Sequence, residues 1–402
     1  MNTLANLIKV GGIRTADVVN RLFDPYEDFT RSFMPPANNA RLYQKAAIFH
    51  ADLITKFRRP DGLFHYNYGT EDIGDQAVHQ GLTTAALAFG NSIQTLSAVL
   101  AMNKLFVNGR LIRGRHAVIE ELYEDNPSND SATGILCGAY FAWRYAGIVT
   151  PLIPMLADEL IANDYCLVNQ DGEVTKYGRL VNRYLTDPQR VSLALAIFKA
   201  AAVMTFEHRY TEHFKKLYVL YGALLPVAEF KFLDYTKTHE AHRCAIHLHI
   251  LADLAGSNEV LYQRCVKGLK RIWTLHRKSR DPWIGALVNG FAPLPQTELS
   301  DVVARLHEYP VNGKPPCTET VNSNNHLWPF QGVKFIKVKG KIRSSQPLPY
   351  HVLPSQDFWP QRHPYMCDGH EGSTDPIVRH NAVDFLAPYY LLRRQGVIRE
   401  DE

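Results

Sequence analysis

The chain has 402 residues, of which 46% are hydrophobic, and a formal net charge of +4. Its Lys and Arg residues are spread along the chain, which argues against a nucleic-acid partner. It has no run of about 18 apolar residues that could span a membrane, and its start lacks the features of a secretory signal. We therefore expect a cytoplasmic protein, with release by lysis or a place in a virion as alternatives.

Residues 1–37 end in the turn cluster Met34-Pro-Pro-Ala-Asn-Asn and are expected to form an arm on a domain that spans 38–402. In that domain, apolar residues recur at helical spacing. The pattern predicts about twelve helices, with a kink or break at Gly90-Asn91 in the second. Their ranges are 39–59, 76–106, 110–123, 131–147, 150–166, 187–207, 210–225, 236–255, 257–277, 281–292, 298–309 and 380–395.

Strand is predicted only near 331–343, where alternation from Val333 to Ile342 indicates one hairpin. Asp171-Gly172 also has the composition of a tight hairpin turn. Residues 344–379 contain Trp359, three histidines and six prolines. We expect this segment to be a long irregular loop over the mouth of the domain, because such loops are usually functional when they are not disordered.

About twelve antiparallel helices in one chain fit either an α-solenoid or a closed double ring of six helical hairpins. A solenoid should repeat a motif of about 34 to 47 residues, and the sequence shows no such repeat. Segments 76–101, 131–147 and 191–205 are apolar or small on nearly all sides, as inner-ring helices must be, whereas 257–277 is amphipathic. The prediction is an all-α (α/α)6 toroid with one small β-hairpin.

Two acidic turns that each precede an apolar helix hold the candidate catalytic residues. The first turn contains Asp72 and Asp75, and the second contains Asp130, about one helical hairpin later. Two carboxyls at one end of a helical ring, one protonated and one ionised, can act as a general acid and a general base. Helix N-capping is the competing structural explanation for each Asp.

Histidine, aromatic and amide side chains near these turns and in later loops are candidates for substrate binding. Aromatic faces suit an apolar face of a substrate, and amides suit its hydroxyl groups. His79 follows Asp75 by four residues, on the same helix face, so a His–Asp pair is the alternative. The full set is His65, Tyr66, Tyr68, His79, Asn325, His326, Trp328 and Trp359.

No metal and no cofactor are expected. His239-Glu-Ala-His242 lacks HExxH spacing and a third acidic ligand. The sequence also lacks a GxSxG motif, a P-loop and a GxGxxG that follows a strand. The common serine-hydrolase, nucleotide-hydrolase and dinucleotide-binding classes are therefore disfavoured.

Short phrases support a family resemblance, among them Asp61-Gly-Leu-Phe, Asp75-Gln, Asp130-Ser-Ala-Thr-Gly134, Asn322-Ser-Asn-Asn-His-Leu-Trp328 and Asp384-Phe-Leu. In these phrases and in the layout of its helices, the chain over residues 39–395 resembles the (α/α)6-toroid, six-hairpin superfamily. This superfamily contains glycoside hydrolases, polysaccharide lyases and sugar epimerases. The resemblance implies an oligo- or polysaccharide partner. Relatives that hydrolyse uronyl glycosides use two Asp residues that correspond to Asp75 (or Asp72) and Asp130.

The expected function is therefore cleavage of a glycosidic bond by carboxyl general acid/base catalysis. A polysaccharide lyase or sugar epimerase is an alternative, with Tyr66, His79 or His326 as the base. A further alternative is a non-catalytic carbohydrate-binding or structural component of a larger assembly.

Overall fold

The computed structural model describes residues 41–65, 67–68, 74–119, 121–182, 187–229, 238–309, 335–338, 341–344, 379–400 and 402. The described part of the chain is mostly helical, with twelve α-helices and five two-stranded sheets. None of its helices is both long and apolar enough to cross a bilayer. The predicted arm, the polar run 322–328 and most of the predicted long loop lie outside these residues.

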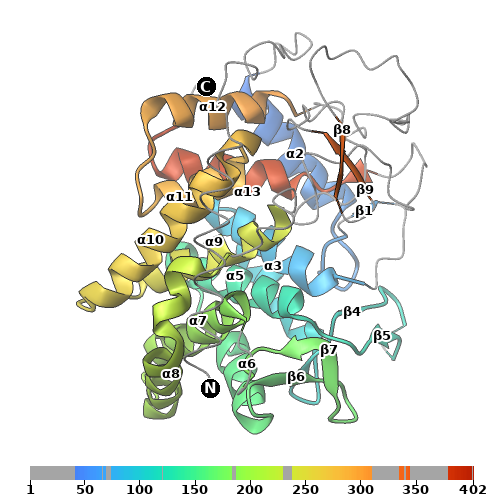
Figure 1. Ribbon diagram of the computed structural model, residues 1–402. Coiled ribbons are helices and arrows are strands. Elements are labelled where there is room, and N and C mark those ends of the chain that lie inside the picture. The colour runs from blue at the N-terminus through green and yellow to red at the C-terminus, as the bar shows by residue number, and fades with distance from the viewer. Residues whose placement is uncertain are drawn as a thin grey trace.

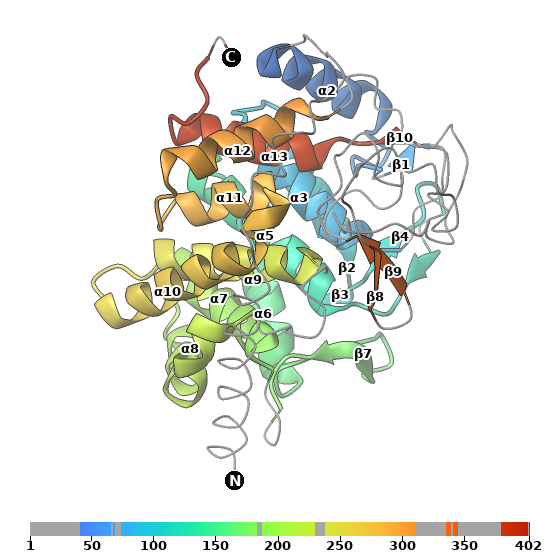
Figure 2. The same ribbon diagram turned by 45° about the horizontal axis from the view of Figure 1, so that its top comes forward.

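Six helices form a closed inner ring, in which each packs against the next and α13 packs back on α3. They are α3 (Gln76–Phe89), α5 (Asn129–Ala146), α7 (Pro188–Thr205), α9 (Thr238–Asp253), α11 (Pro282–Asn289) and α13 (Val383–Arg394). The outer helices are α2 (Leu42–Lys56), α4 (Thr95–Met102), α6 (Leu152–Ala162), α8 (His208–Tyr221), α10 (Glu259–His276) and α12 (Gln296–His307). Figures 1 and 2 show α2, α8, α10 and α12 on the outside of the bundle. This double ring confirms the predicted (α/α)6 toroid.

The contacts between inner helices show that these helices run in the same direction. At the start of α9, His242 Nε2 lies 2.8 Å from Oδ2 of Asp281, which directly precedes α11. At the other end, the rings of Phe89 of α3 and Tyr145 of α5 lie 5.3 Å apart. The ring therefore has an N-terminal rim, where inner helices start, and a C-terminal rim, where they end.

Small residues allow the inner helices to pack closely. All residues of α3 are buried, and most of them are Ala, Thr, Gly or other small or apolar types. A Cβ on Gly138 of α5 would lie 2.7 Å from the carbonyl oxygen of Gly81 of α3, which is closer than real Cβ contacts. The backbones of α3 and α5 therefore touch, and their starts are held near each other on the N-terminal rim.

The prediction of a helix at 110–123 is wrong, and so is the prediction that strand occurs only near 331–343. In place of that helix, β2 (Phe106–Val107) pairs with β3 (Arg110–Leu111), and β4 (Gly114–Arg115) pairs with β5 (Tyr123–Glu124). Asn108 and Gly109 join β2 to β3 with φ angles of 50° and 78°. Two residues with positive φ form the turn that suits a two-residue hairpin, so Asn108-Gly109 overrides the helical periodicity.

Other local predictions are confirmed. β6 (Cys166–Val168) and β7 (Val174–Arg179) form a hairpin around Asp171-Gly172, and the helix predicted at 150–166 ends earlier to make room for it. β8 (Phe335–Val338) pairs with β9 (Lys341–Ser344), which is the hairpin predicted from 333–342. The helix predicted at 76–106 breaks at Gly90-Asn91, between α3 and α4. A short pair, β1 (Asn67–Tyr68) and β10 (Arg379–His380), links distant parts of the chain.

Candidate functional site

The N-terminal rim has an acidic residue at the start of every inner helix. Negative charge is favourable there, because the helix dipole and unpaired backbone N–H groups attract anions. The six residues are Asp75, Asp130, Asp187, Glu240, Asp281 and Asp384, in the order α3 to α13. The contacts of each carboxylate decide whether it serves the fold or is available for chemistry.

Three of these carboxylates have clear structural roles. Asp187 Oδ1 accepts from Gln189 N at 3.0 Å and caps α7, and Asp281 Oδ1 caps α11 by accepting from two backbone N–H groups at 3.0 Å. Burial alone would raise the pKa of Asp281, but His242 and those N–H groups hold it below its ordinary value. Asp384 accepts from the Tyr309 hydroxyl at 2.7 Å. These contacts account for the rim acids of α7, α11 and α13.

Asp75 does not use its side chain as a cap. It precedes α3 in the left-handed conformation, with φ of 55°, and no cap hydrogen bond involves its side chain. Its Oδ1 instead accepts from Arg113 Nε at 2.8 Å and lies 2.6 Å from Arg113 Nη2. Arg113 Nη1 also donates to Glu124 at 3.2 Å. N-capping, the competing explanation from sequence, is therefore wrong for Asp75.

Asp130 is not a cap either. The N-cap of α5 is Ser128, whose hydroxyl accepts from the backbone N–H of Ser131 at 3.3 Å. Asp130 lies in the first helical turn and forms an ion pair with Arg243 of α9. The Asp130 side chain is 31% exposed, whereas that of Arg243 is only 7% exposed. Asp130 thus presents a carboxylate at the surface above a buried arginine.

Arg243 connects the starts of several inner helices. Besides Asp130, its guanidinium lies 3.8 Å from Glu240 Oε1. With the amide of Gln189 oriented to satisfy its neighbours, Gln189 Oε1 accepts from Arg243 Nε at 3.1 Å and Nη2 at 3.0 Å. Burial lowers the pKa of Arg243 to about 10, and the negative charge of Asp75 is among the influences that oppose this shift. Asp75 and Asp130 therefore lie on the same rim, around one buried cation.

Two histidines beside this cluster are buried in α3 and α9. Burial lowers the pKa of His79 to about 4 although Asp75 opposes the shift, so the imidazole is neutral at neutral pH. Below the rim, His247 Nε2 lies 2.9 Å from Thr133 Oγ1, and its Nδ1 lies 2.9 Å from Ser192 Oγ. His247 thereby links α9 to α5 and α7, and its role is structural. No group of three or more His, Cys, Asp or Glu in the described residues could hold a metal ion.

Of the residues predicted from sequence, Asp75 and His79 lie at the start of α3, and Asp130 lies at the start of the neighbouring α5. His65 lies between α2 and α3 in the chain, and its carbonyl oxygen accepts from Asn381, just before α13, at 3.2 Å. Tyr68 belongs to β1, and only its backbone is described. The other predicted site residues lie outside the described residues, namely Asp72, Tyr66, Asn325, His326, Trp328 and Trp359.

Sequence reasoning missed the two arginines, Arg113 and Arg243, and the rim carboxylate Glu240. A signal for Arg243 was present, because it is the single Arg or Lys between Thr238 and Asp253. A lone cation in a helix that is buried on all sides needs a partner of opposite charge. Arg113 gave no such signal, since its segment was predicted to be helical.

No protein-family model matches the chain, and no curated protein does. Among solved structures, the chain is similar to a glycoside hydrolase family 76 mannosidase from Bacteroides thetaiotaomicron. The sequences are 11% identical, the match covers 89% of this chain and 100% of the mannosidase chain, and the TM-score is 0.46. A likeness at this level carries no information on activity.

Proposed function

We propose that this protein is a carbohydrate-active enzyme that cleaves a glycosidic bond, with Asp75 and Asp130 as its pair of carboxyl groups. One observation supports this proposal above the others. Among the rim acids, Asp75 and Asp130 start two helices whose backbones touch, neither caps its helix, and both lie near the buried Arg243. Paired carboxyls at one rim are what acid/base cleavage of a glycoside requires.

The different contacts of the two residues suggest different roles. Asp75 receives two contacts from Arg113, and we assign it the base that takes a proton from the attacking water. Asp130 shares Arg243 with Glu240 and Gln189. We assign Asp130 the acid, which gives its proton to the glycosidic oxygen as the bond from that oxygen to the sugar carbon breaks.

Arg243 and Glu240 support this pair in the proposed reaction. Arg243 is buried beneath Asp130 and anchors the Asp130 carboxylate at the start of α5. Glu240 adds a second negative charge next to the same guanidinium, at 3.8 Å.

The test is turnover of a broad panel of oligosaccharides by Asp75→Asn, Asp130→Asn and Asp187→Asn. The first two variants should lose activity by about 10²-fold or more, because each removes a proton-transfer group. Asp187→Asn is the matched control: it changes a rim carboxylate that caps α7 and lies 3.9 Å from Arg190 Nε, and Asn is an equally good cap. Full activity in both site variants would refute the proposed roles.

A non-catalytic carbohydrate-binding protein is the second candidate, and one observation favours it. Both carboxylates already have an arginine partner, which is also the arrangement of a rim built only for stability. Binding of an oligosaccharide without turnover by the wild-type protein would select this candidate. An absorbance band from an unsaturated uronate product would select a lyase instead.

A further inference from the structure

The outer helix α10 carries its positive charges on one side. Between Val260 and Arg280 the chain has no acidic residue, whereas Arg264, Lys267, Lys270 and Arg271 all lie in α10. With 3.6 residues per turn, these four cations lie within less than half of the helix circumference. The opposite side is buried and includes Leu261, Cys265, Leu269, Ile272 and Trp273. The cationic side therefore faces outward.

Most of this positive charge is not neutralised by the protein. In the described part of the chain, no ion pair involves Arg264, Lys267 or Lys270. Arg264 lies over the ring of Tyr218, 5.3 Å from its centroid. Since this contact supplies no negative charge, Arg264, Lys267 and Lys270 can bind an anion.

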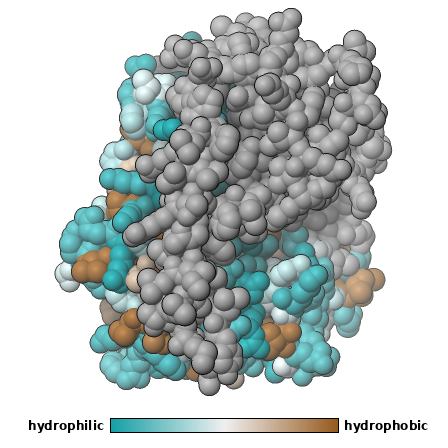
Figure 3. Space-filling view, viewed as in Figure 1, coloured by the Kyte–Doolittle hydropathy of each residue, from teal (hydrophilic) through white to brown (hydrophobic). Residues whose placement is uncertain are grey.

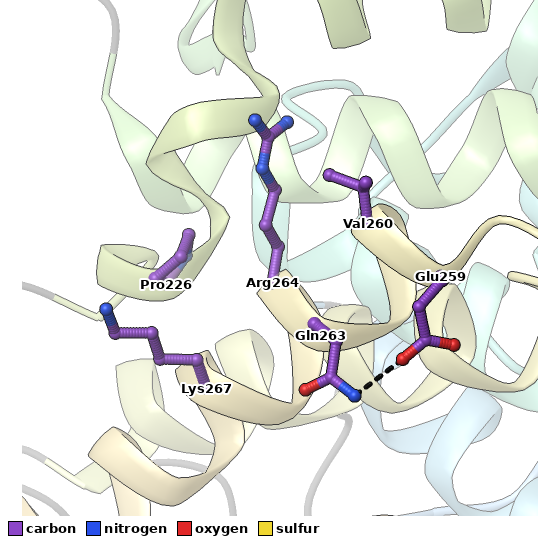
Figure 4. A pocket seen from close by; sticks show the side chains of 6 residues that line it. All are labelled: Pro226, Glu259, Val260, Gln263, Arg264 and Lys267. Atoms are coloured by element: carbon purple, nitrogen blue, oxygen red, sulfur yellow. Dashed lines mark hydrogen bonds between the residues drawn. The ribbon is translucent and has the colours of Figure 1, made fainter.

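A pocket lies between this side of α10 and η3 (Gly222–Val227), with a volume of about 360 Å³. Pro226 and Val260 contribute apolar surface, and Arg264 and Lys267 contribute positive charge (Figure 4). Glu259 and Gln263 also line the pocket, and they are hydrogen-bonded to each other at 2.7 Å. The volume is at the lower end of ligand pockets, which suits one small ring.

The composition of this surface favours one kind of partner. A membrane-binding helix needs several exposed apolar residues, but Val260 is the one exposed large hydrophobic residue in α10. The space-filling view shows mostly hydrophilic atoms at the left edge, where α10 protrudes, with a small hydrophobic area (Figure 3). A DNA-binding protein that makes about 6 to 10 phosphate contacts needs more cations than these four. Apolar surface beside cations fits the ring face and the carboxylate of an acidic sugar.

We propose that the pocket between η3 and α10 binds a uronic-acid unit of a polysaccharide, at a site separate from the N-terminal rim. Pro226 and Val260 contact the apolar face of the sugar ring. Arg264 and Lys267 bind its carboxylate, and Lys270 lies one turn beyond Lys267 for the carboxylate of the next unit. The site does not depend on the roles proposed for Asp75 and Asp130.

The test is calorimetric binding of an oligogalacturonate of defined length and of its methyl ester, which has the same rings without the charge. We expect the acid to bind at least about tenfold more tightly than the ester, and its affinity to fall as salt rises. Lys267→Gln and the double variant with Arg264→Gln should weaken binding of the acid by about tenfold or more. Lys104→Gln, which removes an exposed charge elsewhere, should not change it.

Further variants separate this site from the rim. Asp75→Asn and Asp130→Asn should leave this affinity unchanged, so failure of the proposed catalysis would not affect the result. Because Arg264 packs on Tyr218, thermal unfolding of each variant checks the fold, and the exposed Lys267 gives an independent result. Equal affinity for acid and ester, no effect of Lys267→Gln, or tighter binding of duplex DNA or anionic vesicles would overturn the proposal.

Discussion

Gly81 of α3 lies directly against Gly134 of α5: a Cβ on Gly81 would come within 1.8 Å of the Gly134 carbonyl oxygen. Only glycine permits this approach, because any side chain would overlap the facing backbone. Gly81 and Gly134 follow Asp75 and Asp130 by less than two helical turns. This contact therefore sets how closely the two candidate catalytic carboxyls can lie.

Gly81→Ala should destabilise the protein by about 3 kcal/mol, at the upper end of the usual cost of overpacking, because the methyl group meets backbone rather than a movable side chain. Chemical denaturation measures the change. Ser300→Ala, at an exposed position in α12, is the control and should stay within about 0.5 kcal/mol of wild type. Equal stability of the two variants would show that α3 and α5 are not in backbone contact.

Asp130 and Arg243 should be energetically coupled. Arg243→Met leaves Asp130 and Glu240 without their shared cation and should cost about 3 kcal/mol or more. The added change Asp130→Asn should cost less in that background than in wild type, because its partner is already absent. A double-mutant cycle from urea unfolding measures the coupling. Strict additivity would mean that the ion pair contributes nothing.

Glu159 of α6 should make stability depend on pH. Its carboxylate accepts from Leu111 N at 3.0 Å and Val168 N at 3.4 Å, but burial outweighs these bonds and raises its pKa to about 7. In the unfolded chain, the carboxyl releases its proton near pH 4.5. The folded state keeps that proton up to about pH 7, so the stability from Glu159 is present below pH 4.5 and is lost as pH rises to 7.

The size of this loss should be about 3 kcal/mol, from the difference between the two pKa values. Unfolding free energies of wild type and Glu159→Gln between pH 4.5 and 7.5 measure it. As pH rises, the variant should become more stable relative to wild type. Parallel curves would show that Glu159 does not hold its proton in the folded protein.

Lys45 of α2 should make stability depend on pH in the alkaline range. Stability should rise with pH there, whereas the contribution of Glu159 falls as pH rises. Its buried ammonium donates to the carbonyl oxygens of His307 at 2.6 Å and Tyr309 at 2.8 Å. Burial lowers its pKa to about 8, against the opposing charge of Glu308. Between pH 8 and 10.5 the unfolded chain binds more protons than the folded chain, so stability should rise with pH there, by up to about 3 kcal/mol. Comparing Lys45→Met with wild type over this range isolates the effect, and identical slopes would contradict it.

The toroid was predictable because its signals are local. Inner helices such as α3 and α5 are rich in small and apolar residues on all sides, and Gly90-Asn91 marks the break before α4. The wrong prediction of a helix at 110–123 also came from a local signal, the helical spacing of its apolar residues. The Asn108-Gly109 turn was as visible as the helical spacing but was not given priority over it.

The sequence by itself determined the ring of helices and the acidic residues at their starts, since helical period, turn residues and helix dipoles act over a few neighbours. Only the tertiary structure decided which acids cap their helices and which face a cation. Asp187 and Asp281 bond to backbone within three residues, but Asp75 meets Arg113, and Asp130 meets Arg243 on another inner helix. Such pairings depend on how the closed ring brings distant helix starts together, which no local pattern encodes.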